Sequence, residues 1–192
     1  MELYVKAVNA FFRTVNLEHE LLNMRLMLFL SSPEGSINRA EVNAWMPSPK
    51  AIADIQVGNP WFRSYSFVDI ASLGERAFLK LGRDDEACEL ARLVLSSEPK
   101  LDKKWILMQS HCVLGQVATK RGNLDEADVQ FASALEEAKL SRLPMLEVLA
   151  ARDWKRYLLE PNGRDASGAE AVIDGACAAM EISRGEIASL LL

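Results

Sequence analysis

Two short segments of the chain repeat the same pattern at a fixed distance. The segment Gly-Arg-Asp-Asp-Glu-Ala begins at Gly82, and Gly-Asn-Leu-Asp-Glu-Ala begins 40 residues later, at Gly122. A period of this length is typical of stacked helix–turn–helix units, whose repeats are about 34 to 47 residues long. Because one such unit cannot bury its apolar face alone, neighbouring units stack and share a core. The repeat therefore predicts an all-α fold.

The spacing of apolar residues supports this prediction along most of the chain. These residues recur every three or four positions, as in amphipathic helices, and no segment alternates in the way that a strand requires. Gly82 and Gly122 each end a helix, since glycine adopts the left-handed backbone of a helix C-terminus without strain. From these signals we expect helices at about 2–31, 36–46, 50–56, 63–81, 84–96, 102–121, 124–140, 144–159, 166–180 and 184–191.

Several helix starts carry side chains that are suited to capping. Ser36 or Asn38 is expected to cap the second helix, and Asn123 the helix that follows Gly122. Ser183 and Glu186 have the spacing of a capping box, in which each side chain bonds the backbone N–H of the other residue.

The regularity of the pattern divides the chain into two parts. Residues 1–60 are expected to form a helical segment that packs on 61–192, where the repeats lie and 184–191 forms a C-terminal cap. The Met/Leu/Phe-rich stretch 21–30 is about half as long as a membrane-spanning helix, so we expect it to be a core helix against 36–66. Trp45 and Trp61, which flank the least regular stretch, are expected to pin it to the body.

Residues 108–141 resemble a tetratricopeptide repeat. The residues that stand at the small and large positions of that family are Leu114, Gly115, Ala118, Gly122, Ala127, Phe131 and Ala134. The chain departs from the family pattern at Ala118, which stands where an aromatic residue is usual, and at Lys139, which replaces the closing proline.

Two further segments match the same pattern more loosely. In 68–101 the matching residues are Phe78, Gly82, Ala87, Ala91 and Pro99, while Gly74-Glu75 replaces Leu-Gly. In 149–180, Tyr157 takes the aromatic position, and Ala171 and Ala178 take small ones. The resemblance implies about three antiparallel helix hairpins in a right-handed superhelix, with longer helices than the family standard. The first helix of each hairpin would then line a concave groove.

Composition and charge narrow the range of functions. The net charge of −5 disfavours non-specific binding of nucleic acid, which depends on a surplus of Lys and Arg. Cys88, Cys112 and Cys177 are widely spaced, so we expect them to be small buried residues in a reducing compartment. No secretory signal or membrane-spanning segment is recognised. We therefore expect an intracellular, cytoplasmic protein that contacts neither nucleic acid nor membrane.

No motif for catalysis or for cofactor binding was found. His111 and Cys112 are neighbours, but side chains of adjacent helical residues point about 100° apart and cannot share one metal ion. Phosphate-binding glycine loops and nucleophile motifs are absent from the sequence. We therefore expect no catalytic residue, no metal site and no cofactor, and we expect the protein not to be an enzyme.

The one candidate site lies along the groove that the resemblance implies. A row of polar and basic residues on its lining helices is expected at Ser72, Arg76, Lys80, Cys112, Gln116, Lys120 and Lys155. Such a row would attract an acidic segment or a C-terminal carboxylate of a partner. An alternative remains open: Lys80 and Lys120 sit in the last turn before a glycine cap, where the helix dipole alone favours a cation.

These observations favour a non-catalytic interaction module or scaffold that binds a peptide or partner protein in a concave helical groove. The alternative is a regulatory or assembly subunit, or a piece of one, whose activity resides elsewhere. The two hypotheses differ in what they require of residues 1–30: an exposed apolar face there would favour the assembly role.

Overall fold

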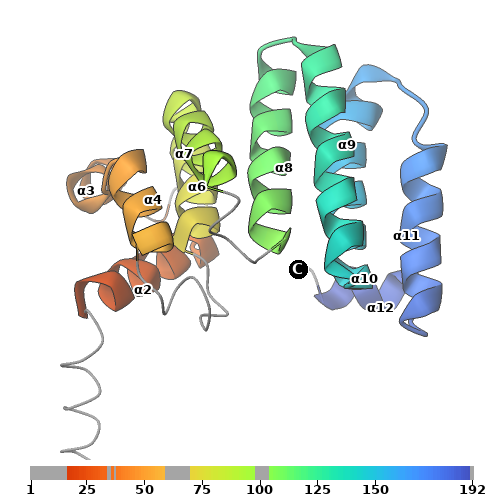
Figure 1. Ribbon diagram of the computed structural model, residues 1–192, viewed down its shortest axis with the longest axis horizontal. Coiled ribbons are helices and arrows are strands. Elements are labelled where there is room, and N and C mark those ends of the chain that lie inside the picture. The colour runs from red at the N-terminus through yellow and green to blue at the C-terminus, as the bar shows by residue number, and fades with distance from the viewer. Residues whose placement is uncertain (1–16, 34–35, 37, 59–69, 98–103, 191–192) are drawn as a thin grey trace, which may run out of the picture.

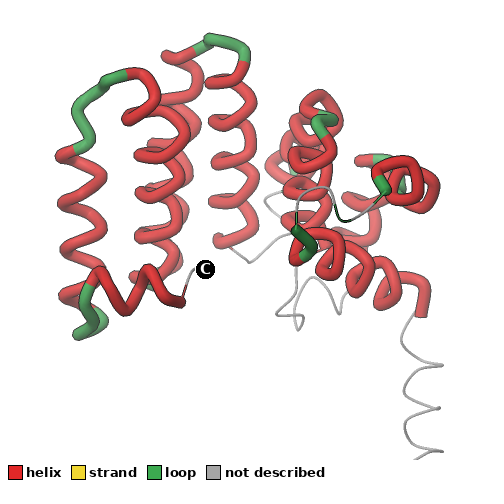
Figure 2. The backbone as a smooth tube through the Cα atoms, turned by 180° about the vertical axis from the view of Figure 1, so that it is seen from behind, coloured by secondary structure: helices red, strands yellow, loops and turns green. Residues whose placement is uncertain are grey.

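The computed structural model describes most of the chain, namely residues 17–33, 36, 38–58, 70–97 and 104–190. All regular secondary structure in these ranges is helical, and none of it is strand, which confirms the predicted all-α class (Figure 2). The α-helices are α2 (Leu17–Ser31), α3 (Arg39–Trp45), α4 (Pro49–Gly58), α6 (Ile70–Leu81), α7 (Asp84–Ser96), α8 (Lys104–Lys120), α9 (Leu124–Ser141), α10 (Pro144–Trp154), α11 (Ser167–Ala179) and α12 (Arg184–Leu190). A π-helical turn (Lys155–Leu159) and a 3-10 turn (Glu160–Asn162) follow α10.

The helix ends follow the predicted signals closely. Gly82 and Gly122 have φ of 76° and 78°, so both occupy the left-handed region that was expected of them. Asn38 caps α3, since its Oδ1 accepts a hydrogen bond from the N–H of Ala40 at 3.0 Å. The predicted capping box also forms: the N–H of Ser183 donates to Glu186, and the N–H of Glu186 donates to the Ser183 hydroxyl. The expected positions 2–16, 63–69 and Trp61 lie outside the described residues.

The prediction that Asn123 caps α9 was wrong. Its side chain makes no capping bond, and its Nδ2 instead lies 3.5 Å from Oε2 of Glu126. The backbone explains the difference, because φ of −85° and ψ of 68° depart from the extended conformation that is typical of a capping residue. The acidic first turn of Asp125 and Glu126 still suits the positive end of the helix dipole.

Helices that follow one another in sequence also pack side by side. Helix α6 packs on α7, α7 on α8, α8 on α9, α9 on α10, and α10 on α11. In Figure 1 the helices from α8 to α11 stand next to one another and α12 runs across their lower end, whereas α2 lies below α4 and α6 on the other side of the molecule. Helix α2 packs on α6, and α4 packs on both α6 and α7. Helices α2 and α4 therefore pack on the α6–α7 pair.

The buried apolar side chains form two clusters, and α8 contributes to both. The N-terminal cluster comprises Leu22, Leu26, Phe29, Val42, Met46, Ile52, Ala53, Ile70, Ala71, Ala77, Phe78, Leu81, Ala87, Cys88, Leu90, Ala91, Val94, Ile106, Leu107, Val113, Leu114 and Val117. The C-terminal cluster comprises Met108, Cys112, Ala118, Ala127, Phe131, Ala134, Leu135, Ala138, Val148, Ala150, Ala151, Leu158, Leu159, Ala169, Ile173, Ala176, Cys177 and Ile187. Neighbours on α8 such as Val117 and Ala118 belong to different clusters because they point about 100° apart.

Close helix approach depends on two glycines, one in each cluster. A Cβ atom on Gly115 would lie 2.8 Å from the ring of Phe131, and one on Gly74 would lie 2.9 Å from Cδ1 of Ile52 and 3.1 Å from Cδ2 of Leu90. Both positions are in helix interiors, where glycine costs about 1 kcal/mol relative to alanine. The glycines are therefore explained by packing rather than by backbone conformation.

Two expectations about packing were wrong in part. Leu22, Leu26 and Phe29 of α2 are buried as expected of a core helix, but other large apolar residues of the same helix are exposed, namely Leu21, Met24, Met27 and Leu28. The apolar residues of α2 are spread around the helix rather than gathered on one face, and α2 packs on α6 through one side. No helix of the described chain has both the length and the apolar character needed to cross a membrane.

In the third predicted repeat, the alanines in contact differ from those expected. Ala171 and Ala178 are exposed, and Ala169 and Ala176, two residues earlier, are buried instead. The chain reaches α11 through the π-helical and 3-10 turns after α10, which change the register that a simple repeat alignment assumes.

Candidate functional site: a basic groove

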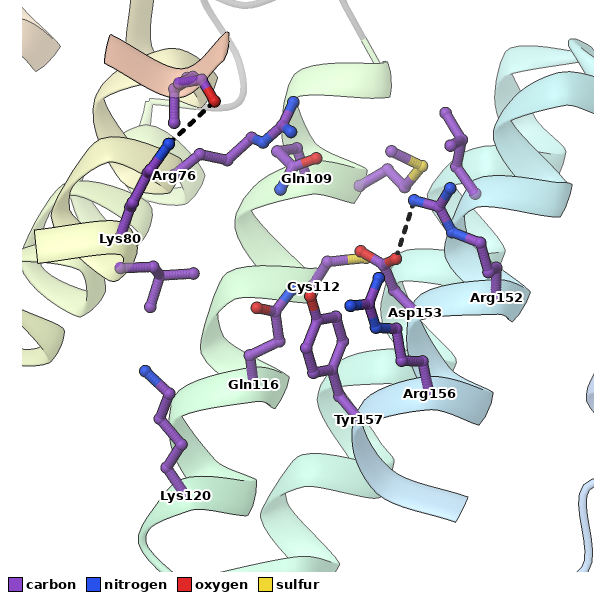
Figure 3. A pocket seen from close by; sticks show the side chains of 14 residues that line it. Arg76, Lys80, Gln109, Cys112, Gln116, Lys120, Arg152, Asp153, Arg156 and Tyr157 are labelled. Atoms are coloured by element: carbon purple, nitrogen blue, oxygen red, sulfur yellow. Dashed lines mark hydrogen bonds and ion pairs between the residues drawn. The ribbon is translucent and has the colours of Figure 1, made fainter. Parts of the chain in front are cut away.

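Five of the predicted groove residues line one cavity of about 520 Å³. Arg76 and Lys80 reach it from α6, and Gln116 and Lys120 from α8 (Figure 3). Cys112 lies at the same wall, on the turn of α8 that precedes Gln116. Ser72, by contrast, is buried within α6 and does not line the cavity. We call this cavity the basic groove.

The third wall comes from α10 and the π-helical turn that follows it. Its residues are Leu149, Arg152, Asp153, Arg156 and Tyr157. Lys155, which was predicted to continue the row, does not line the groove: its ammonium group forms ion pairs with Glu160 and Glu170. These two partners raise the pKa of Lys155. A helical residue next to Arg156 points about 100° away from it, so the two cations serve different surfaces.

The sequence contained a signal for the correct residues of this wall. The predicted row repeats with the same 40-residue period as the glycine caps: Gln116 follows Arg76 by 40 residues, and one further step leads to Arg156. The same count leads from Cys112 to Arg152. The structure places both arginines in the groove, together with Asp153 and Gln109, which sequence reasoning did not single out.

Two lysines of the row are already engaged in bonds within the protein. The ammonium group of Lys80 donates to the main-chain carbonyls of Phe29, Leu30 and Ser32, at 3.0, 3.1 and 2.6 Å, and so satisfies the C-terminal end of α2. The ammonium group of Lys120 lies 2.7 Å from a carboxylate oxygen of Asp84, at the start of α7. The alternative explanation from the dipole of their own helices is therefore incomplete, because each lysine reaches another helix.

Asp153 is the one carboxylate in the lining of the basic groove. Its Oδ1 accepts a hydrogen bond from Arg152 at 3.2 Å, and its side chain is only 16% exposed. Burial raises the pKa of Asp153, and the positive charges of Arg152, Arg76 and Arg156 oppose this shift. The groove therefore holds five cationic side chains around a single, largely buried acid.

Arg76 and Arg156 differ from the other cations because they have no ion pair with any described residue. Both are exposed, and they enter the groove from different walls, Arg76 from α6 and Arg156 from the π-helical turn after α10 (Figure 3). The guanidinium of Arg156 lies over the ring of Tyr157, 5.4 Å from its centroid, and this stacking orients the side chain. These two arginines are the cations most available to a ligand.

The chemistry of the groove is poorly suited to nucleophilic catalysis. The Cys112 thiol has a pKa well above its usual value because it is buried and lies near Asp153 and Glu75, so it is not a thiolate at neutral pH. His111 points elsewhere, and its Nδ1 is 2.8 Å from Oε1 of Gln130. Cys88 and Cys177 are also free and buried. Within the described ranges, no group of His, Cys, Asp and Glu side chains is arranged to hold a metal ion.

Comparison of the chain with protein-family models, with curated proteins and with solved structures gives no match. The function must therefore be inferred from the geometry and charge of the basic groove.

Proposed function

We propose that the pairs α6–α7, α8–α9 and α10–α11 are three units of a tetratricopeptide-like superhelix. Two observations support this. The glycine caps at 82 and 122 lie 40 residues apart. The same interval separates three residues that line one groove, namely Arg76, Gln116 and Arg156. A repeated register of this kind is expected when equivalent helices stack with equivalent orientation.

We further propose that the protein is a non-catalytic module that binds an acidic segment of a partner protein in the basic groove. The observation that carries this proposal is the charge imbalance of the groove: five cations surround one carboxylate, in a chain whose net charge is −5. Arginine forks bind carboxylates and phosphates through paired hydrogen bonds, and such pairs are stronger than neutral ones. The groove is thus the favoured place for an anionic ligand.

The side chains that line the groove also favour binding over catalysis. Asp153 is held by Arg152, and the thiol of Cys112 is protonated and buried, so neither is a suitable partner for acid–base work. The remaining polar groups, Gln109, Gln116 and Tyr157, are neutral hydrogen-bonding groups that can contact a peptide main chain.

The proposal can be tested by fluorescence anisotropy with three labelled 12-residue peptide libraries, acidic, neutral and basic in net charge. The acidic library should bind and the basic library should not, and binding should weaken as salt rises. The double variant Arg76→Glu/Arg156→Glu should lower the affinity for the acidic library at least about tenfold, because each lost charge-assisted pair contributes about 1.5–3 kcal/mol.

The matched control is Arg39→Glu/Arg92→Glu. Both of these arginines are exposed and lie outside the groove lining, and the double variant changes the net charge by the same amount. If both double variants lose affinity equally, the attraction is a property of net charge and the groove is not the binding site. If no acidic peptide binds the unaltered protein, the proposed function is wrong.

One observation favours a second function, as a subunit of a larger assembly. Helix α2 exposes Leu21, Met24, Met27 and Leu28, with exposed fractions between 46% and 66%. Apolar patches of this kind mark protein contacts more often than isolated exposed residues do. Light scattering coupled to size exclusion tests this role: if the protein self-associates, Met24→Glu/Leu28→Glu should return it to the monomer. A monomer at all concentrations, with unaltered solubility in the variant, would argue against self-assembly through α2.

A further inference from the structure

The cations of the basic groove fall into two classes. Lys80, Lys120 and Arg152 are each bonded within the protein, to the end of α2, to Asp84 and to Asp153 respectively. Arg76 and Arg156 have no such partner among the described residues. Since each guanidinium carries one full positive charge, and the carbonyls bonded to Lys80 are neutral, at least two positive charges are left for a ligand.

The number of unpaired charges decides which anion suits the groove. Asp153, the one carboxylate of the lining, already forms an ion pair with Arg152. A ligand carboxylate carries a single negative charge and two acceptor oxygens, so it would leave one of the two unpaired arginines unneutralised.

A phosphate monoester meets the requirement better. At neutral pH it carries a charge of about −1.5 to −2 and has three strong acceptor oxygens. One phosphate can therefore accept paired hydrogen bonds from two arginine forks that approach from opposite sides. Gln109 and Tyr157, which line the same groove, add neutral donors.

We propose that the basic groove anchors its partner through a phosphorylated serine or threonine side chain held between Arg76 and Arg156. This inference rests on the proposed function and specifies its ligand. It assigns one role to both residues: Arg76 and Arg156 each bind the phosphate.

The test uses the acidic 12-residue library with its central position fixed as phosphoserine, glutamate or serine. By anisotropy, the phosphoserine peptides should bind about tenfold or more tightly than the glutamate peptides. Arg76→Lys and Arg156→Lys should each remove most of this preference, because lysine retains the charge and loses the planar fork. Arg92→Lys, on the outer face of α7, is the matched control and should leave the preference unaltered.

A second variant tests whether the phosphate lies beside Asp153. Asp153→Asn removes the internal carboxylate, so the phosphoserine peptides, which carry the larger negative charge, should gain affinity more than the glutamate peptides do. Inorganic phosphate should compete with the phosphopeptide more strongly than chloride does at the same ionic strength.

The outcomes separate this inference from the proposed function. If all three acidic libraries bind equally and Arg76→Glu/Arg156→Glu abolishes binding, the phosphate inference is overturned and the acidic-peptide proposal stands. If phosphoserine peptides bind no better than neutral peptides without phosphate, both are overturned. A phosphate preference that persists unaltered in Arg76→Lys and Arg156→Lys would also overturn the assigned geometry.

Discussion

The N-terminal and C-terminal clusters are built from different side chains. Eight of the 18 buried residues in the C-terminal cluster are alanine, against five of 22 in the N-terminal cluster. The N-terminal cluster is filled mainly by Leu, Ile, Val and Phe, with Trp45 and Trp105 packed at its edge. Small residues let helix backbones approach closely, whereas long side chains fill a wider and less regular space.

The two regions also differ in buried polar groups. Fully buried polar groups form hydrogen bonds inside the N-terminal region: Ser110 donates to Glu75 at 2.6 Å, and Gln56 accepts from the N–H of Ala71 at 3.4 Å. In the described part of the C-terminal region no polar residue is fully buried, and the largely buried Asp153 lies at the wall of the groove. Stacked helices of one fold class can therefore be stabilised in two ways, by closely packed helix backbones or by larger side chains with internal hydrogen bonds.

The largest expected effect comes from removing a fully buried ring in each cluster. Phe131→Ala and Phe78→Ala should each lower the free energy of unfolding by about 3–5 kcal/mol. Phe131→Ala should cost more, because the surrounding alanines have short side chains that cannot move into the cavity. Urea unfolding measures both. A larger loss for Phe78→Ala would contradict the distinction between the clusters.

The next effect separates two lysines at equivalent positions of the repeat. Lys80→Ala should cost about 1.5–3 kcal/mol, because three carbonyls at the end of α2 lose a charged donor. Lys120→Ala should cost less than about 1 kcal/mol, since its partner Asp84 forms a surface pair. Hydrogen exchange should show faster exchange in α2 for the first variant alone. Equal losses would mean that the contact between Lys80 and α2 adds no stability.

A smaller effect is expected from the two packed glycines. Gly115→Ala should be destabilising by about 1–2 kcal/mol, because the new methyl group must displace the rigid ring of Phe131. The free energy that this displacement costs exceeds the gain in helix propensity from alanine. Gly74→Ala should be nearly neutral or slightly stabilising, since the atoms in its way are the flexible ends of Ile52 and Leu90. Thermal unfolding compares the two variants, and a more harmful Gly74→Ala would reverse the expected order.

The smallest expected effects are pH-dependent changes in melting temperature. They have opposite signs for substitutions at Asp153, in the groove, and at Glu170, on the outer side of the α10–α11 pair. Burial raises the pKa of Asp153, so its charged form costs stability at pH 7, and this cost disappears as the pH falls below about 4. Asp153→Asn should therefore raise the melting temperature at pH 7 and have little effect at pH 3.

Glu170, on the outer side, should behave in the opposite way. Lys155 and Arg184 lower the pKa of Glu170, so its contribution to stability is present above about pH 4 and is lost as the pH falls through its folded pKa. Glu170→Gln should lower the melting temperature slightly at pH 7 and leave it unaltered at pH 3. Scanning calorimetry at both pH values checks this pair, and shifts of the same sign in the two variants would contradict the assignment.

Much of the helix layout could be predicted from the sequence, because its signals are local. The glycine at 82 or 122 permits a left-handed turn without strain, and the capping box at Ser183 involves residues of a single turn. The partial exposure of α2 could not be predicted, because apolar residues on every side of a helix do not show which side finds a neighbour.

The basic groove was predictable in part for the same reason. Arg76, Lys80, Gln116 and Lys120 follow from the repeat period, and Arg152 and Arg156 follow from one further period. The bonding partners of these residues could not be predicted from the sequence. Lys80, for example, donates to the end of α2 at a sequence separation of about 50 residues, and no local pattern encodes that contact. The structure was therefore needed to show which cations are free to bind a ligand.

The position of α8 limits how the chain could be divided. Its side chains supply Leu107 and Val117 to one cluster and Met108 and Ala118 to the other. A fragment that ends before Lys104 would leave the N-terminal cluster without one wall, and a fragment that begins after Lys120 would do the same to the C-terminal cluster. The two regions thus form one inseparable piece, and a fragment of either kind would need α8 to fold.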